Sequence, residues 1–186
     1  MRERAMVKKS AMMGTTVGLL ALLSLGASGA GERLHPKLEP LRPFVGKTLR
    51  GEFANSTPEK PLFDVQRWER ALNGKAIRIL HSVNAGEYGG ETLLFWDEKQ
   101  KSVVFYYFTT EGFDTHGTMT VEADGGYTAH EIVTGNGDGI TEVRSRTRDL
   151  GDGRVEGSSS YLKNGEWVPG HSVIYVEAPD AEVVFR

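Results

Sequence analysis

The chain has 186 residues, 22 basic and 25 acidic side chains, a formal net charge of −3 and no cysteine. The basic residues form no long run, which excludes the electrostatic footprint of a nucleic-acid-binding protein and a polybasic membrane patch. Without cysteine the fold has no disulfide and no site for a lipid attached after export. Its stability therefore has to come from an apolar core.

The first 30 residues predict a signal peptide. Residues 2–9 hold four basic side chains, residues 11–25 form an apolar stretch, and Ser28-Gly29-Ala30 supplies the small residues of a cleavage site. The apolar core is short for a membrane span of about 20 residues. We therefore expect cleavage, no stable membrane insertion and a periplasmic or secreted mature chain; a retained membrane anchor is the alternative.

The remainder, residues 31–186, is expected to form a single domain. The first 30 residues hold four of the 22 basic and one of the 25 acidic residues, so the remainder carries a net charge of −6. Three prolines within residues 34–45 exclude a long helix there. Leu38, Leu41 and Phe44 recur every third residue, which predicts a short helical turn packed against one end of the domain.

From residue 48 onward the chain is a series of short β segments separated by turn signals. Asn73-Gly74 and Asn164-Gly165 are typical of two-residue type I′ hairpins. Such a series predicts a ten-stranded antiparallel meander, and closure into a barrel removes the edges that an open sheet would expose. The expected strands are 48–53, 62–71, 75–83, 91–97, 102–109, 114–122, 126–133, 140–149, 154–163 and 167–177.

Two hairpins allow the register to be predicted. A two-residue turn at Asn73-Gly74 pairs Gln66 with His81, Trp68 with Ile79 and Glu69 with Arg78, the last as an ion pair. A four-residue tip at 98–101 pairs Thr92 with Tyr107, Leu94 with Phe105 and Trp96 with Val103. Both faces of these hairpins are apolar, unlike those of a strand with one face in water. Three interpretations are open: an aromatic-lined cavity, an outer interaction patch, or plain packing on both sides.

A family pattern runs through nearly the whole mature chain. Its motifs are GKTLRGEF at 46–53, WE at 68–69 with LNGK at 72–75, YGGETLLFWD at 88–97, YYFTTEG at 106–112 and YLKNGEW at 161–167. The pattern resembles a secreted bacterial domain-of-unknown-function family with a lipocalin-like (calycin) β-barrel, distantly similar to fatty-acid-binding proteins and nitrobindins. The resemblance implies a closed barrel. Leu49 stands where such barrels usually carry the tryptophan that plugs one end.

Histidine is the main candidate for metal chemistry, because the loop around Asn136-Gly137-Asp138-Gly139 lacks the acidic first and twelfth ligands of a calcium loop. The five histidines show no zinc spacing, and the pair Asp114 and His116 is too small to hold a metal. Nitrobindin-like barrels hold haem through one axial histidine, and His81 is the candidate for such a ligand because it lies among apolar neighbours on a strand. A structural, hydrogen-bonded histidine is the alternative, and no other cofactor is predicted.

Three arginines alternate along one expected strand and therefore share a face: Arg144, Arg146 and Arg148. Facing outward they would form a solvated stripe, which is favoured because unpaired buried arginines are costly. Facing inward they would grip a carboxylate.

The leading hypothesis is a barrel that holds a small hydrophobic or amphipathic molecule in its cavity. The expected ligand-binding residues are Trp68, Ile79, His81, Trp96, Phe105 and Tyr107. No catalytic signature is present, and the enzymatic alternative is a barrel enzyme with His81 or His116 as general base. A third alternative is a filled barrel that acts, or self-associates, through the outer face of strands 91–97 and 102–109.

Overall fold

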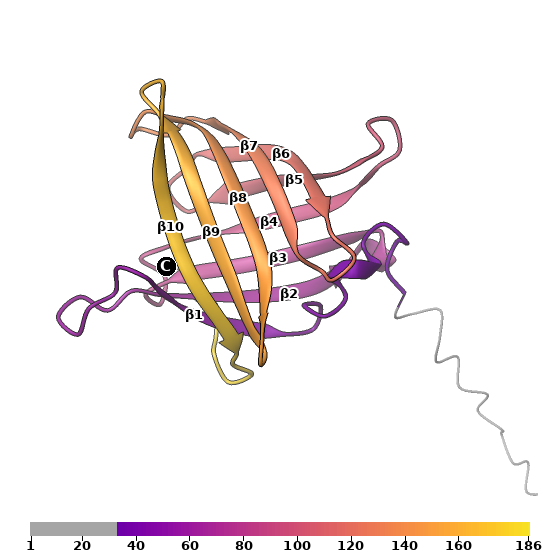
Figure 1. The fold of residues 1–186 in the computed structure, drawn as a ribbon, viewed down its shortest axis with the longest axis horizontal. Helices are drawn as coiled ribbons and strands as arrows, with labels where there is room; N and C mark the ends of the chain where they lie inside the picture. Colours follow the sequence, from indigo (N-terminus) through magenta and orange to yellow (C-terminus); the bar gives the residue numbers. More distant parts are fainter. Residues whose placement is uncertain (1–32) are drawn as a thin grey trace, which may run out of the picture.

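The computed structural model describes residues 33–186, which form one closed antiparallel barrel (Figure 1). Each strand pairs with the next in the chain, and the last strand pairs with the first. This confirms the predicted ten-stranded meander barrel; the predicted signal peptide lies outside the described residues. The strands are β1 (Thr48–Phe53), β2 (Phe63–Ala71), β3 (Ala76–Val83), β4 (Tyr88–Asp97), β5 (Ser102–Thr109), β6 (Asp114–Val121), β7 (Tyr127–Thr134), β8 (Ile140–Gly151), β9 (Arg154–Lys163) and β10 (Glu166–Glu177).

A short N-terminal turn closes one end of the barrel. Its helical part is the 3-10 turn η1 (Glu39–Leu41), and Leu38 and Leu41 are fully buried. Phe44 stacks on Trp68 of β2 with 4.9 Å between ring centroids. We call Leu38, Leu41, Phe44 and Trp68 the plug. The described residues 33–186 contain no helix long and apolar enough to cross a membrane.

The predicted registers of both hairpins are confirmed. Trp68 lies opposite Ile79 and Gln66 opposite His81 on β2 and β3, and Trp96 lies opposite Val103 on β4 and β5. The connection between β2 and β3 is wider than a two-residue turn. It is the 3-10 turn η2 (Leu72–Gly74), and all three of its residues have positive φ.

A glycine permits the barrel to close between β1 and β10. Gly51 pairs with Tyr175, and a Cβ atom on Gly51 would lie 2.4 Å from Cγ1 of Val173 and 2.6 Å from Cδ1 of Tyr175. No other residue leaves that space. The Tyr175 ring therefore crosses β1, and its hydroxyl reaches Asp64 of β2 at 2.8 Å.

The C-terminal tail crosses the outside of the barrel. After β10, the amide of Ala178 donates to the carbonyl of Thr48, and the amide of Val184 donates to Oγ of Ser82 at 3.0 Å. Ser82 is buried on the outer face of β3, where the tail covers it. The last strand is thus followed by a strap over the first strands.

Part of the outer face is apolar and exposed. Tyr106 and Phe108 of β5 and Ile132 of β7 are 48%, 57% and 42% exposed, and Tyr106 stacks on His116 of β6. Self-association through the outer face of strands 91–97 and 102–109 stays a prediction.

Candidate functional site

The interior of the barrel contains a cavity of about 890 Å³ that is partly open to solvent. It runs from the plug to the loops at the opposite end, including Phe113, Asn136 and Asp138, and we call these loops the mouth. Because side chains alternate along each strand, every second residue points into this space. The side chains do not fill the barrel, which favours a ligand-holding interior over the filled-barrel alternative.

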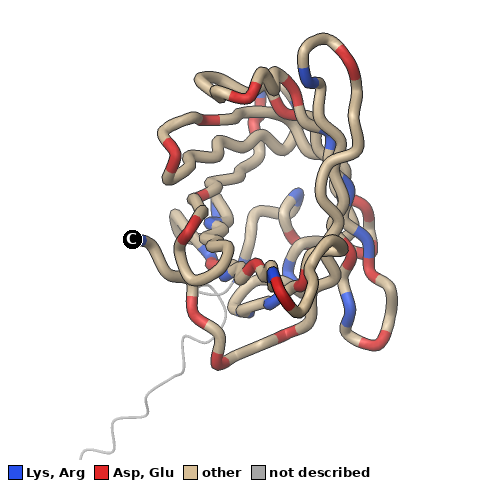
Figure 2. Tube along the Cα trace, turned by 90° about the vertical axis from the view of Figure 1, so that its left-hand side faces the viewer, with Lys and Arg blue, Asp and Glu red and all other residues tan. Residues whose placement is uncertain are grey.

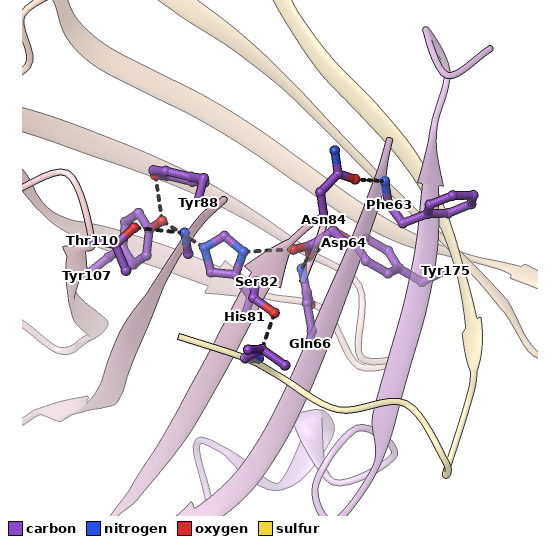
Figure 3. A network of polar contacts seen from close by, with 12 residues as sticks. Phe63, Asp64, Gln66, His81, Ser82, Asn84, Tyr88, Tyr107, Thr110 and Tyr175 are labelled. Atoms are coloured by element: carbon purple, nitrogen blue, oxygen red, sulfur yellow. Dashed lines mark hydrogen bonds and ion pairs between the residues drawn. The ribbon is translucent and has the colours of Figure 1, made fainter. Parts of the chain in front are cut away.

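A chain of four polar side chains lies on one wall of the cavity (Figure 3). Nδ1 of His81 is 2.8 Å from Oδ1 of Asp64, and Nε2 of His81 is 2.7 Å from the Tyr107 hydroxyl. The Tyr107 hydroxyl is in turn 2.6 Å from the hydroxyl of Tyr88. The chain connects β2, β3, β5 and β4, so it fixes the relative positions of four strands.

The direction of these hydrogen bonds follows from Asp64. An ionised carboxylate only accepts, so Nδ1–H of His81 donates to Asp64, and in the neutral imidazole Nε2 accepts a hydrogen bond from the Tyr107 hydroxyl. Tyr107 then accepts from Tyr88. The Tyr88 hydroxyl therefore keeps a lone pair as acceptor for a further donor.

Asp64 is satisfied on both oxygens although it is only 2% exposed. Its Oδ2 accepts from the Tyr175 hydroxyl at 2.8 Å and from Nε2 of Gln66 at 3.1 Å. Oε1 of Gln66 accepts from the indole N–H of Trp68 at 3.3 Å, which ties the network to the plug. A fully bonded network of this kind is ordered in advance of any ligand.

The phenols of this wall are held in the protonated form. Burial raises the pKa of Tyr88 to about 12, although the hydrogen bond to Tyr107 opposes the shift. Burial also raises the pKa of Tyr107, and the neighbouring Tyr88 adds to the effect. The pKa of Tyr175 is raised by burial and by the charge of Asp64. All three hydroxyls therefore keep their protons at neutral pH and can donate hydrogen bonds.

A second polar group lies on β7, five strands around the barrel from β2. Glu131 lines the cavity, and its Oε2 accepts from Oγ1 of Thr115 at 2.8 Å. Burial raises the pKa of Glu131, while hydrogen bonds from Thr115 and Ser145 oppose the shift. The dominant physical effect at Glu131 is therefore loss of water around its carboxylate.

A third polar group lines the cavity from β9 and β10. Nδ1 of His171 is 2.6 Å from the Tyr161 hydroxyl and 3.1 Å from Oγ of Ser159. Burial lowers the pKa of His171, which favours the neutral imidazole. The sequence shows His171 only as one of five histidines, and it predicts neither a role nor a hydrogen-bond partner for this residue.

The structure brings five of the six predicted ligand-binding residues together. Trp68, Ile79, His81, Phe105 and Tyr107 line the cavity; whether they contact a ligand stays a prediction. Trp96 is not among the lining residues. It lies at the plug end, where its ring stacks on His35 at 6.2 Å and the Lys37 ammonium lies 5.3 Å from its centroid.

His116 points away from the cavity. It stacks on Tyr106 on the outer face with 6.0 Å between ring centroids, so it is not placed to act on a molecule inside the barrel. In the described part of the chain, no three His, Asp or Glu side chains are placed to hold a metal ion together.

The arginines of β8 form the outward stripe. The Arg144 guanidinium lies 4.1 Å from the ring centroid of Trp167, and Arg148 forms an ion pair with Glu156 of β9. Arg146 is also exposed. The interpretation of these arginines as inward carboxylate grips therefore finds no support in the geometry.

The carboxylates of the cavity were not predicted. Asp64 shares a face with Gln66 and Trp68 because it is two residues away on the same strand, so the correct register already placed it beside His81. Glu131 offered a weaker signal: it alternates with Ala129 and Val133 on an otherwise apolar face. That face can be assigned inward only once the barrel is known.

A scan against protein-family models finds no match, and a search of curated proteins finds no similar sequence. The fold itself is consistent with a calycin-like barrel, as the resemblance implies.

The residues around His81 do not fit an axial haem ligand. Its two ring nitrogens are engaged by Asp64 and Tyr107 at 2.8 and 2.7 Å. An iron ion would need one of these nitrogens and would displace a buried hydrogen bond.

Proposed function

We propose that the mature protein is exported and holds a small amphipathic molecule, non-covalently, in the barrel cavity. The observation that carries the proposal is the cavity of about 890 Å³ with apolar walls and three separate polar groups. Ligand sites typically combine such a volume with a few fixed polar groups that orient the ligand.

The walls of the cavity suit a ligand with one polar end. Ile79, Phe105 and Val133 offer apolar surface, while the Asp64–His81–Tyr107–Tyr88 chain offers an ordered polar wall. Since the chain satisfies its own hydrogen bonds, it does not collapse when the ligand leaves. Such preorganisation lowers the entropic cost of binding.

A cavity-filling variant tests the proposal. The neutral fluorescent probe N-phenyl-1-naphthylamine should bind the purified mature protein with increased emission, and Ile79→Trp should weaken its affinity about tenfold or more by occupying the cavity. Leu80→Trp, one residue along and facing outward, is the matched control and should leave affinity unchanged. No probe binding to the wild type, or equal loss in both variants with folding intact, contradicts a ligand cavity.

Export has a separate test. Expression of the full chain in a bacterial host, followed by fractionation and N-terminal sequencing, should yield a product beginning at Gly31 outside the cytoplasm. A full-length product retained in the membrane would support the anchor alternative instead.

The Asp64–His81–Tyr107 chain favours a second candidate function, general acid–base catalysis. Asp64 orients His81 so that Nε2 is the basic nitrogen, and Tyr107 and Tyr88 extend that proton path along the wall. A carbonyl compound such as 2-decanone in D₂O would then exchange its α-protons faster with the protein than in buffer. His81→Gln should remove the excess rate; exchange at the buffer rate with wild type eliminates this candidate.

A further inference from the structure

The ionisable groups that line the cavity are mostly acidic. Four carboxylates belong to the lining, against one arginine and the two histidines already described. The arginine is Arg146, which is exposed and belongs to the outward stripe of β8. The lining carboxylates are Asp64, Glu111, Glu131 and Asp138.

Glu131 differs from Asp64 in having no imidazole or other basic side chain bonded to it. Asp64 is paired with His81, whereas the hydrogen-bond partners of Glu131 are the hydroxyls of Thr115 and Ser145. The neighbouring His130 points to the outer face and pairs with Glu142 at 2.7 Å. Within residues 33–186, Glu131 forms no ion pair, so its carboxyl group faces the cavity without a counter-charge.

The mouth adds negative charge in front of this carboxylate. Figure 2 views the barrel from this end, and acidic segments are spread over the loops around it. The connections between strands at this end carry Glu59, Glu87, Glu111, Asp138 and the adjoining Asp114 and Glu166, against Lys60, Lys163 and Arg186 of the tail, which lies beside Gly86. An entrance with an excess of negative charge raises the local concentration of positively charged ligands.

We infer that the ligand carries a cationic amine on an apolar body, with the ammonium group paired to Glu131. The inference rests on the proposed function, because it needs a molecule inside the cavity. An ammonium ion would supply the missing counter-charge, and its remaining N–H groups can donate to hydroxyl oxygens of the lining. A fatty-acid carboxylate would instead face Glu131 and Asp64, while the one arginine of the lining, Arg146, is exposed on the outward stripe.

A matched series of probes tests the charge preference: decylamine, decanol and decanoic acid share one chain length and differ in the head group. At pH 7.5 and low ionic strength, below their critical micelle concentrations, the mature protein should bind decylamine about tenfold more tightly than decanol, and decanoic acid more weakly than decanol. Displacement of N-phenyl-1-naphthylamine measures all three.

The Glu131→Gln variant should bind decylamine and decanol equally. Glu142→Gln, which removes a carboxylate of the outer face, is the control and should keep the preference. Two results would overturn the inference about the amine and leave the cavity function standing. In the first, all three probes bind equally well; in the second, decanoic acid binds best. If none of the three binds and the neutral probe does not bind either, the proposed function itself fails.

Discussion

A carboxylate that loses water on folding makes stability depend on pH. The folded-state pKa of Glu131 is raised, so the folded protein binds a proton more tightly than the unfolded chain. Its contribution to stability is therefore full below the unfolded value of 4.5 and is lost as pH rises through the folded pKa. The charged and titratable groups around it are Tyr88 and Tyr107 from the other walls, Tyr127 on its own strand and His130 behind it.

Glu131→Gln removes this pH dependence. The variant should gain stability over the wild type as pH rises from 4.5 through the folded pKa, and the difference should then stay constant. Urea unfolding at a series of pH values measures it. The opposite sign, a variant that loses stability at high pH, would mean that the hydroxyl partners of Glu131 outweigh its burial.

The hydroxyl of Tyr107 is the middle of the polar chain, and its loss should affect both neighbours. Tyr107→Phe leaves Nε2 of His81 and the Tyr88 hydroxyl without a partner, at a cost of about 1–3 kcal/mol in unfolding free energy. Tyr106→Phe, the adjacent exposed tyrosine, should change stability by less than about 0.5 kcal/mol. Equal values for the two variants in urea unfolding would contradict a structural role for the chain.

At the scale of the elements, the contact between β1 and β10 depends on one missing side chain. Gly51→Ala would force Val173 and Tyr175 aside and disturb the Tyr175 hydrogen bond to Asp64, so we expect a loss of about 1–3 kcal/mol. Gly137→Ala in the mouth is the control, because an added Cβ there meets nothing within 4 Å. Thermal unfolding of the two variants should differ by several degrees; a Gly51→Ala protein as stable as wild type would show that β1 can shift freely.

The strands were predictable because each one is short, strongly β-forming and bounded by turn residues. The pairing of Trp68 with Ile79 and of Trp96 with Val103 followed from the position of the centre of each turn, which was predicted correctly although the β2–β3 connection is longer than expected. An error of one residue would have exchanged the faces. The backbone conformation of the connection between β2 and β3 was not predictable, because Leu72 adopts a positive φ, which is unfavourable for leucine.

The site was less accessible to sequence reasoning than the strands, because it depends on distances across the barrel. His81 and Tyr107 were both predicted as lining residues, but their hydrogen bonds to each other and to Asp64 appear only in the closed structure, which defines the inward faces. Trp96 shows the opposite case. Trp96 lies on the same face of β4 as the lining residues Tyr88 and Thr92, yet the N-terminal turn covers it. Contacts between a turn and a distant strand leave no periodic pattern in the sequence.

For the whole molecule, the plug separates the cavity from solvent at one end. Leu41→Ala should lower the unfolding free energy by about 2–5 kcal/mol because its side chain is fully buried. We also expect the bound fluorescent probe to dissociate faster, since a loosened plug offers a second exit. Stopped-flow dissociation measures the rate, with the exposed Leu72→Ala as control. An unchanged rate in a destabilised variant would mean that exchange occurs through the mouth alone.

The pairing of the last strand with the first has a consequence for how the chain reaches its native state. Nine of the ten strand contacts join neighbours in sequence, but β1 stays unpaired on one side until β10 has been synthesised and has arrived. Closing so large a loop is entropically costly and slow compared with forming a hairpin. Until that final step both margins of the sheet are open to other chains. We therefore expect aggregation during synthesis to increase with the time between formation of the first hairpin and arrival of β10. A chain truncated before residue 166 lacks β10 and cannot close the barrel.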